Sequence, residues 1–160
     1  MKRMVLVLLA AALNVGSPAP AFRVNDLAGK KFTSNQLKGS LTVLDVWATW
    51  CEPCIEDIPM FNRLYAKYAG AGIKVIGIAV QSGSAADIKK HVAKLGVQYP
   101  VLVGNDHIVG EYVEVGFPIT YLISPDGKIA KKYIGVLPDK QTRKEMDLEQ
   151  EIERFIKDQR

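Results

Sequence analysis

Histidine, cysteine and tryptophan are scarce in this chain, whose 160 residues include two of each. A structural zinc site needs about four nitrogen or sulfur ligands, and both histidines, His91 and His107, lie far along the sequence from the cysteine pair Cys51 and Cys54. Covalent haem attachment needs a histidine directly after such a pair, where this chain has Ile55. The composition therefore argues against a zinc site and against a c-type haem.

The chain also lacks a strong excess of one charge. Its formal net charge is +4 with a pI near 9.0, and its basic residues occur as scattered pairs such as Lys30-Lys31 and Lys89-Lys90. A nucleic-acid-binding domain concentrates such residues in one stripe or patch, so we expect no nucleic-acid partner. No internal repeat is evident, and the length suits one domain with a single core.

A long apolar run is missing too, but the N-terminus has the pattern of an export signal. The basic pair Lys2-Arg3 precedes a short apolar run from Met4 to Leu13. This is typical of a secretory signal peptide, and it is too short for the ~20 residues of a membrane span. We expect residues 1–12 to be a signal peptide and residues 13–160 to form one domain. The alternative is an N-terminus that stays on the mature protein.

The two cysteines lie at a junction between a strand and a helix. Residues Leu41 to Trp47 form a short apolar run rich in branched and aromatic side chains, which predicts a buried strand. Apolar residues then recur at helical spacing from Ile55 to Tyr68, which predicts a helix beginning near Cys51. The two residues between Cys51 and Cys54 allow one helical turn to close a disulfide.

A thiol at the start of a helix is more acidic than a free thiol. The N-terminal end of a helix carries a partial positive charge and unpaired backbone donors, which favour the thiolate. We therefore expect Cys51 to be the exposed attacking thiol and Cys54, one turn deeper, to be the resolving thiol. The junction favours a redox-active disulfide, with no other cofactor and no metal.

The residues around the pair resemble the thioredoxin superfamily. Five positions match its pattern: Asp45, Trp50, Pro53, Pro59 and Pro118. The superfamily has a cis-proline opposite the dithiol, and the resemblance gives that place to Pro118. It also implies an α/β fold with a central mixed β-sheet flanked by helices.

Within the superfamily, the closer resemblance is to the extracytoplasmic TlpA and ResA group of thiol-disulfide oxidoreductases. Three segments carry it: VGSPAPAF at 15–22, WATWCEPC at 47–54 and FPITYLISPDGKI at 117–129. The resemblance covers nearly all of the chain after the first dozen residues. The chain departs from this group at two positions. Ile119 follows Pro118 where the group often has threonine, and Asp57 stands where ResA-like members have glutamate. These departures concern substrate preference rather than the fold.

Strand and helix signals alternate after the dithiol, which indicates an α/β sheet with covered faces. The pattern predicts strands at 73–80, 101–103, 117–123 and 128–133, and helices whose apolar faces include Ile88 to Leu95 and Leu148 to Ile156. A turn at 124–127 joins the last two strands into a hairpin. The interval from Cys54 to Pro118 exceeds that of thioredoxin, and the TlpA and ResA group has a similar insertion, which we place at 82–99.

Three acidic residues lie near the cysteines. Asp45 should be buried on its strand, which is costly unless the carboxylate is paired or protonated, so it is either the proton acceptor for Cys54 or a strand-end residue bonded to backbone. Asp57 shares the helix face of Cys54 and either tunes the thiols or is a solvated helix charge. Glu52 opposes a thiolate on Cys51 and favours a more reducing couple, and it is also an ordinary first-turn acid.

Other residues would frame the dithiol. Trp50 directly precedes Cys51 and either covers the dithiol or simply packs, and Pro53 lies between the cysteines. Proline cannot donate a hydrogen bond to a sheet. The backbone at Phe117, before Pro118, should therefore stay free to pair with an incoming peptide.

The function predicted is exchange of the dithiol with protein disulfides outside the cytoplasm, with the protein acting as a reductant. The second hypothesis is a peroxiredoxin-like peroxidase, but that family has threonine and proline where this chain has Ala48 and Leu44. The third is a thiol metal-binding module or copper chaperone, for which the two thiols lack a third ligand. A redox-inactive interaction domain is the fourth, and the intact cysteine pair argues against it.

The resemblance also implies partners and a location. ResA-like relatives reduce apocytochrome c before haem attachment and are recharged by a membrane thiol transporter. We therefore expect protein thiols and disulfides as substrates, apocytochrome c among them, and a membrane thiol-reductant transporter as the electron source. We expect a monomer in the periplasm or another extracytoplasmic space.

Overall fold

The computed structural model describes residues 13–135 and 140–159. The signal-peptide prediction concerns residues 1–12, which lie outside the described residues. Within the described part, one mixed sheet of seven strands is flanked by four α-helices and a short 3-10 helix. The predicted α/β thioredoxin-like class is confirmed.

The sheet has the order β2-β1-β5-β4-β3-β6-β7. Its strands are β1 (Arg23–Asp26), β2 (Lys31–Thr33), β3 (Leu41–Trp47), β4 (Ile73–Ala79), β5 (Val101–Val103), β6 (Ile119–Ile123) and β7 (Ile129–Ile134). Strand β4 pairs in parallel with both β3 and β5, and all other pairs are antiparallel. Strand β6 begins at Ile119 rather than at the expected Phe117, because Pro118 has no N–H to donate to a neighbouring strand.

A capping residue precedes each of the first three α-helices. They are α1 (Glu52–Tyr68), α2 (Ala85–Leu95), α3 (Asp106–Tyr112) and α4 (Lys140–Asp158), with the 3-10 helix η1 at Ser34–Leu37. Helix α2 starts with a capping box between Ser84 and Asp87. The long interval before Pro118 contains α2, β5 and α3. Helix α3 was not predicted, because its seven residues include a glycine and bury only two side chains.

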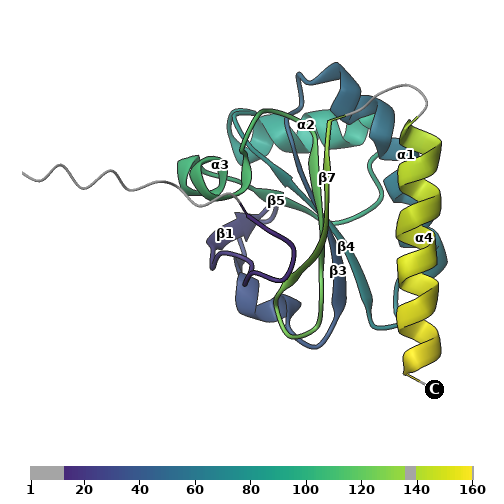
Figure 1. Cartoon of the computed structure of the whole chain (residues 1–160). Coiled ribbons are helices and arrows are strands. Elements are labelled where there is room, and N and C mark those ends of the chain that lie inside the picture. Colours follow the sequence, from purple (N-terminus) through teal and green to yellow (C-terminus); the bar gives the residue numbers. More distant parts are fainter. Residues whose placement is uncertain (1–12, 136–139, 160) are drawn as a thin grey trace, which may run out of the picture.

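The central strand β3 separates two apolar clusters. All seven of its residues are buried, and successive side chains of a strand point to opposite faces. Val43 and Trp47 pack in a cluster with both cysteines and the apolar faces of α1, α2 and α4. Leu44 and Val46 pack in the other cluster, which includes residues of α3. Figure 1 shows α1 and α4 side by side on one side of the sheet and α3 on the other.

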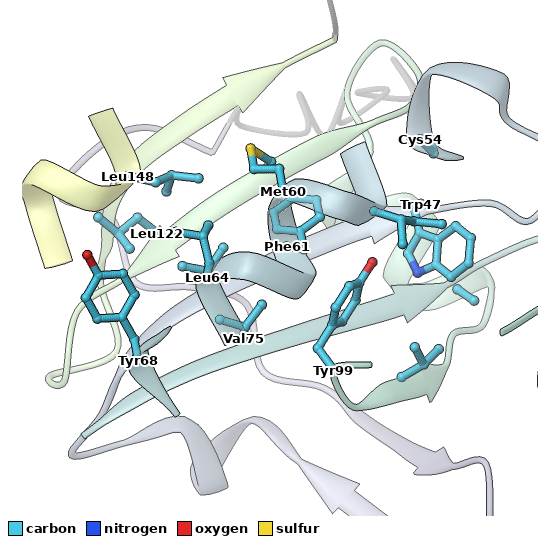
Figure 2. Packing of buried hydrophobic residues seen from close by; sticks show 14 of the residues in the cluster. Trp47, Cys54, Met60, Phe61, Leu64, Tyr68, Val75, Tyr99, Leu122 and Leu148 are labelled. Carbon is cyan, nitrogen blue, oxygen red and sulfur yellow. The ribbon is translucent and has the colours of Figure 1, made fainter. Parts of the chain in front are cut away.

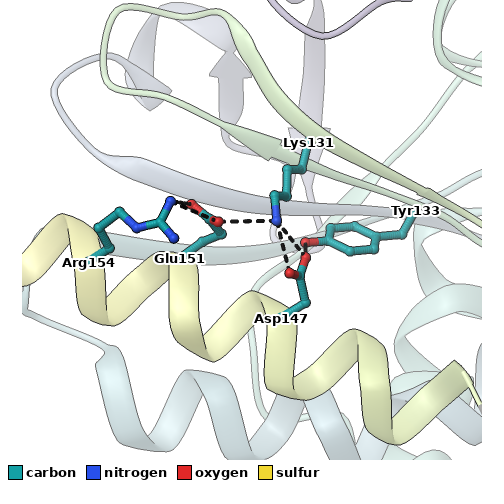
Figure 3. Close-up of polar contacts among 5 residues, drawn as sticks. All are labelled: Lys131, Tyr133, Asp147, Glu151 and Arg154. Carbon is teal, nitrogen blue, oxygen red and sulfur yellow. Dashed lines mark hydrogen bonds and ion pairs between the residues drawn. The ribbon is translucent and has the colours of Figure 1, made fainter.

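Helix α4 is fixed to the hairpin strand β7 by a polar network (Figure 3). Lys131 Nζ lies 2.9 Å from both carboxylate oxygens of Asp147 and 3.1 Å from Glu151. The hydroxyl of Tyr133 donates to Asp147, and Arg154 pairs with Glu151 at 3.2 Å. These contacts join two successive turns on one face of α4 to one strand and so set the position of the helix along the sheet.

The opposite flank of α4 rests on α1. Arg63 makes a two-pronged pair with Glu145 at 2.8 and 2.7 Å, while Leu148 and Ile152 are fully buried in the cluster that contains the cysteines. The predicted apolar face of this helix is confirmed. Burial of that face holds α4 against the core, and the ion pairs fix its register.

Candidate active site

The dithiol sits where the sequence places it, between β3 and α1. Cys51 is the cap residue of α1, with extended backbone, and Cys54 lies in the first turn. The two are joined by a disulfide across a Cα–Cα distance of 5.3 Å. The backbone N–H of Cys54 donates to Cys51 Sγ at 3.3 Å. The closed redox pair thus lies at the start of a helix that has proline at its second position, with the cysteine spacing that one helical turn requires.

Cys51 is less exposed than we expected. Its exposed fraction is 7%, against 1% for Cys54. Both residues belong to the apolar cluster between the sheet and its helices, and Phe117 packs against that cluster. The expected order of exposure therefore holds, but Cys51 is a largely buried residue in the disulfide form.

An aromatic pair lies beside the dithiol. Trp50 is 61% exposed, and its indole N–H donates to the carbonyl of Gln81 at 2.8 Å. Its ring meets that of Phe117 edge to face, with centroids 5.9 Å apart. The Phe117-Pro118 peptide bond is cis, as the resemblance implied, and Pro118 is buried. Trp50 is therefore an exposed apolar surface with a fixed orientation, rather than a core residue.

Asp45 is buried on the same face of β3 as the cysteines. It lies between Val43 and Trp47, which both pack in the cysteine-containing cluster, so the alternation of a strand directs its side chain to that cluster. Its Oδ1 accepts a hydrogen bond from Thr120 Oγ1 at 2.9 Å, across the β3–β6 pairing. The hydrogen bond described for this carboxyl comes from the Thr120 hydroxyl, which does not favour the alternative of a strand-end residue bonded to backbone, and its role as proton acceptor stays a prediction.

The electrostatic surroundings of Asp45 make it a group that titrates near neutrality. Burial is the largest influence and raises its pKa to about 7, since the charged form loses its hydration. The positive charge of Lys144 opposes this, the negative charge of Asp57 adds to it, and the hydrogen bond from Thr120 lowers the pKa slightly. A carboxyl with such a pKa exchanges protons readily at physiological pH.

Asp57 is fully buried, so its interpretation as a solvated helix charge is wrong. Its Oδ2 lies 2.8 Å from Nζ of Lys144, whose side chain is 6% exposed. Lys144 comes from the first turns of α4, 87 residues later in the chain. The ion pair therefore joins α1, the helix that carries the dithiol, to α4.

Figure 2 shows the apolar packing beneath the dithiol. Trp47, Phe61 and Tyr99 fill the space between α1 and the sheet, with Phe61 and Tyr99 edge to face at 5.7 Å. Gly77 gives this packing its room, because a Cβ there would lie 2.9 Å from Trp47 Nε1 and 3.0 Å from the Tyr99 ring. Burial, and then the charges of Asp45 and Asp57, hold the pKa of the Tyr99 hydroxyl well above its usual value. The wall of the site is therefore apolar and tightly packed.

The remaining polar candidates lie at the surface. Glu52, the first residue of α1, is exposed, as is Pro53. His91 contacts the carbonyl of Asp87, and His107 contacts the carbonyl of Ala21. Across residues 13–135 and 140–159, no three histidine, cysteine or acidic side chains are grouped as a metal site would require.

Residues 15–132 match the AhpC/TSA family, which is nearly three quarters of the chain. The chain belongs to the AhpC/TSA family. Among its relatives, the thiol-disulfide oxidoreductase ResA of Bacillus thuringiensis is 35% identical over 136 residues, covering 84% of this chain and 76% of the relative. ResA of Bacillus subtilis is 30% identical over 138 residues, covering 86% and 76%.

Solved structures agree with this place in the AhpC/TSA family. A Chlorobium tepidum protein described as a thiol:disulfide interchange protein DsbE superposes with a TM-score of 0.79 at 27% identity, over 91% of this chain and 99% of the other. The thioredoxin domain of a Bacteroides vulgatus thiol-disulfide oxidoreductase gives 0.76 at 26% identity, over the same shares. The protein is thus a thioredoxin-like thiol-disulfide oxidoreductase.

Lys144 is the residue of this AhpC/TSA-family site that our sequence analysis missed. It lies four residues before Leu148 and eight before Ile152, so it falls on the apolar stripe of α4. A lysine on such a stripe is a signal for a buried ion pair. Its partner cannot be read from the helix itself, because Asp57 lies on another element.

Proposed function

We propose that this protein reduces protein disulfides outside the cytoplasm, with Cys51 as the attacking thiol and Cys54 as the resolving thiol. The observation that carries the proposal is a closable cysteine pair at the start of α1, together with a buried carboxyl group of raised pKa and an aromatic pair whose Trp50 is exposed. In its reduced form this arrangement supplies two electrons, a proton acceptor and an apolar contact surface.

The reaction takes two steps. The Cys51 thiolate attacks one sulfur of the client disulfide, whose S–S bond breaks, and the released client thiolate takes up a proton from solvent. Cys54 then gives its proton to Asp45, and its thiolate attacks Cys51 Sγ. The mixed disulfide breaks, the second client sulfur leaves as a thiolate that takes up a proton from solvent, and the Cys51–Cys54 disulfide forms. Two electrons have passed to the client, and Asp45 returns the proton to water.

The exposed Trp50 and the half-buried Phe117 would receive the client chain. Trp50 offers a broad aromatic face, and Phe117 lies against it. The described strand pairing of β6 starts only at Ile119, so the backbone at Phe117 lies outside the sheet ladder. An extended client peptide could pair there while its cystine reaches Cys51. Glu52 beside Cys51 would keep the couple reducing.

Reduction of insulin by the purified, reduced protein tests the activity. We expect turnover that depends on both cysteines and little consumption of hydrogen peroxide under the same conditions. Rapid peroxide turnover without insulin reduction would favour the peroxidase alternative instead. Tight Cu(I) binding by the dithiol, without exchange, would favour the metal-binding module.

Export rests on the N-terminal pattern and on the ResA and DsbE names of its relatives. Among the described helices, none has the length and apolar character required to cross a bilayer. We expect residues 1–12 to be absent from the mature protein, which the intact mass of native material would show. A cytoplasmic species that keeps Met1 would contradict export.

The partners follow from the same group of relatives. We propose apocytochrome c as a client, as part of cytochrome c maturation, and a membrane thiol-reductant transporter as the electron donor, with the protein acting as a monomer. Trapping clients on a Cys54→Ser variant in the native organism tests this. Recovery of extracytoplasmic proteins without any cytochrome c would contradict the client assignment but not the exchange activity.

A further inference from the structure

Lys144 is a buried cation in the apolar cluster that holds the dithiol. Its Nζ lies 2.8 Å from Asp57 Oδ2 and 5.2 Å from the centroid of the Phe61 ring. A buried ammonium group is costly unless it is paired, and removing one member of a buried pair leaves an uncompensated charge. The pair therefore holds the side chain of Asp57 against Lys144 inside this cluster.

Asp45 is close enough to respond to both members of this pair. The charge of Lys144 lowers the pKa of Asp45, and the charge of Asp57 raises it, with Lys144 the stronger of the two. Asp45, Asp57 and Lys144 thus share one buried region, and the 2.8 Å ion pair of Lys144 is with Asp57. Burial raises the pKa of the other carboxyl, that of Asp45.

The elements packed around Asp45 differ in the charged and polar groups that they place near it. The titratable and polar groups that act on it are Asp57 from α1, Lys144 from α4, Tyr99 from the segment before β5, and Thr120 from β6. Both cysteines of α1 lie in the apolar cluster to which this face of β3 contributes. Strand β4 places Gly77 opposite Asp45, which has no side chain. The positive charge in this group therefore comes from α4 alone among the described residues.

The position of Lys144 depends on how α4 is held. The network in Figure 3 fixes Asp147 and Glu151 to Lys131 of β7, and Arg63 of α1 holds Glu145. Lys144 directly precedes Glu145, so both flanks of the helix place it over Asp57.

We propose that Lys144 is a positioning residue for the exchange: its ion pair engages the side chain of Asp57 and so leaves Asp45 as the group that takes the proton of Cys54. The proposal deepens the proposed function and rests on it for the role of that proton. In the resolving step, the Cys54 S–H bond breaks, the proton goes to Asp45, and the electron pair left on Cys54 forms the new bond to Cys51 Sγ. The bond between Cys51 and the client sulfur breaks, and the client leaves as a thiolate that solvent protonates. Lys144 touches none of the reacting atoms.

The sign of each substitution follows from the charges. Lys144→Met removes the influence that lowers the Asp45 pKa. The titration of Asp45 therefore moves to higher pH. Asp57→Asn removes a neighbouring negative charge and leaves Asp45 as the acidic neighbour of Lys144, so the titration moves to lower pH.

Carboxyl carbon NMR of the full chain in its disulfide form measures this directly. We expect Asp45 to titrate near pH 7 in the wild type and about one pH unit or more higher in Lys144→Met. Lys144→Arg should restore most of the wild-type value because it keeps the charge. An unchanged Asp45 midpoint in Lys144→Met would overturn the proposal.

Lys67→Met is the matched control. Lys67 spans the same α1–α4 contact, pairs with Glu149 and Glu153, and is 53% exposed. Its loss should leave the Asp45 midpoint unchanged, and a shift equal to that of Lys144→Met would show a general loosening of α4 instead. If Lys144→Met does not fold by circular dichroism, Asp57→Asn replaces it, and a midpoint that does not fall in that variant overturns the proposal.

The kinetic counterpart is the pH dependence of client release in a single turnover. In Lys144→Met the acidic limb of this step should move by the same amount as the NMR midpoint, while formation of the mixed disulfide keeps its wild-type pH dependence. If the acidic limb of the pH–rate profile stays in place while the NMR midpoint of Asp45 moves, Asp45 is not the group that takes the proton in this step, and the proposal is overturned. The titration needs no client, so a protein that shows the shifts but fails to reduce insulin would contradict the proposed function alone.

Discussion

The amide of Cys54 donates a hydrogen bond to Sγ of Cys51, 3.3 Å away, in the first turn of α1. The sulfur of Cys51 therefore lies against the unpaired donors of a helix N-terminus, where negative charge is stabilised. Cys54, within that turn, is more deeply buried. This asymmetry distinguishes two cysteines that are only three residues apart.

The first prediction concerns their order of reaction. Cys54→Ser should accumulate mixed disulfides with substrates, because the second attack is lost, whereas Cys51→Ser should form none. Non-reducing gel electrophoresis with a model disulfide would show the difference. Adducts on Cys51→Ser but not on Cys54→Ser would reverse the assignment.

The second prediction concerns the rate at which product leaves. Asp45→Asn removes the proton acceptor for Cys54, so release of the client should slow by roughly 100-fold, the usual scale for a lost acid or base. Formation of the mixed disulfide should change much less. Stopped-flow measurement of both steps across pH tests this, and wild-type release in the variant would make water the acceptor.

The third prediction is a stability that falls with pH. The pKa of Asp45 rises from 3.8 to about 7 on folding. Between these values the unfolded chain loses a proton that the folded protein keeps, so the free energy of unfolding decreases as pH rises and is highest below pH 3.8. The difference of about three pH units corresponds to ~4 kcal/mol at most.

Asp45→Asn removes this term. Relative to the wild type, the variant should gain up to ~4 kcal/mol between about pH 4 and pH 8. Urea unfolding of the disulfide form at several pH values measures the gain. Parallel pH profiles of variant and wild type would mean that Asp45 has an ordinary pKa in the folded protein.

The fourth prediction concerns redox potential. Glu52 is an exposed acid next to Cys51, and its charge disfavours the thiolate, so the couple should lie near the thioredoxin value of about −270 mV. Glu52→Gln should raise the potential by roughly 20 mV or less, as expected for one surface charge. Glu56→Gln, one turn further along α1, is the control. A wild-type value above about −180 mV would contradict a reductant.

The fifth prediction tests the packing beneath the dithiol. Gly77→Ala places a Cβ within 2.9 Å of Trp47 Nε1 and 3.0 Å of the Tyr99 ring, so we expect a loss of about 1–3 kcal/mol in the free energy of unfolding. Gly110→Ala is the control, since a Cβ there meets nothing within 4 Å and lies in helix α3. That variant should gain about 0.5–1 kcal/mol. Equal effects in denaturant unfolding would contradict this account.

Local features of the site could be predicted from the sequence because each rests on neighbouring residues. The apolar run at 41–47, the cysteine spacing and the helical periodicity after it define β3, the disulfide and α1 without any distant contact. The capping box of Ser84 and Asp87 likewise starts α2. The place of Pro118 opposite the dithiol came from the resemblance and not from periodicity.

Contacts between distant elements could not be predicted in this way. The low exposure of Cys51 and the orientation of Trp50 toward Phe117 depend on how the β6 side of the sheet meets the start of α1. Helix α3 was missed because it is short and contains a glycine, and it forms by packing two side chains against the far face of the sheet.

The sequence by itself determined where the thiols lie, which of them begins the helix, and that Asp45 sits on a buried strand. The tertiary structure alone decided the charge balance around that carboxyl. Lys144 meets Asp57 only because α4 packs across α1, and Thr120 reaches Asp45 only through the register of β3 with β6. Electrostatic energy depends on distance and burial in space, and neither quantity can be read from separation along the chain.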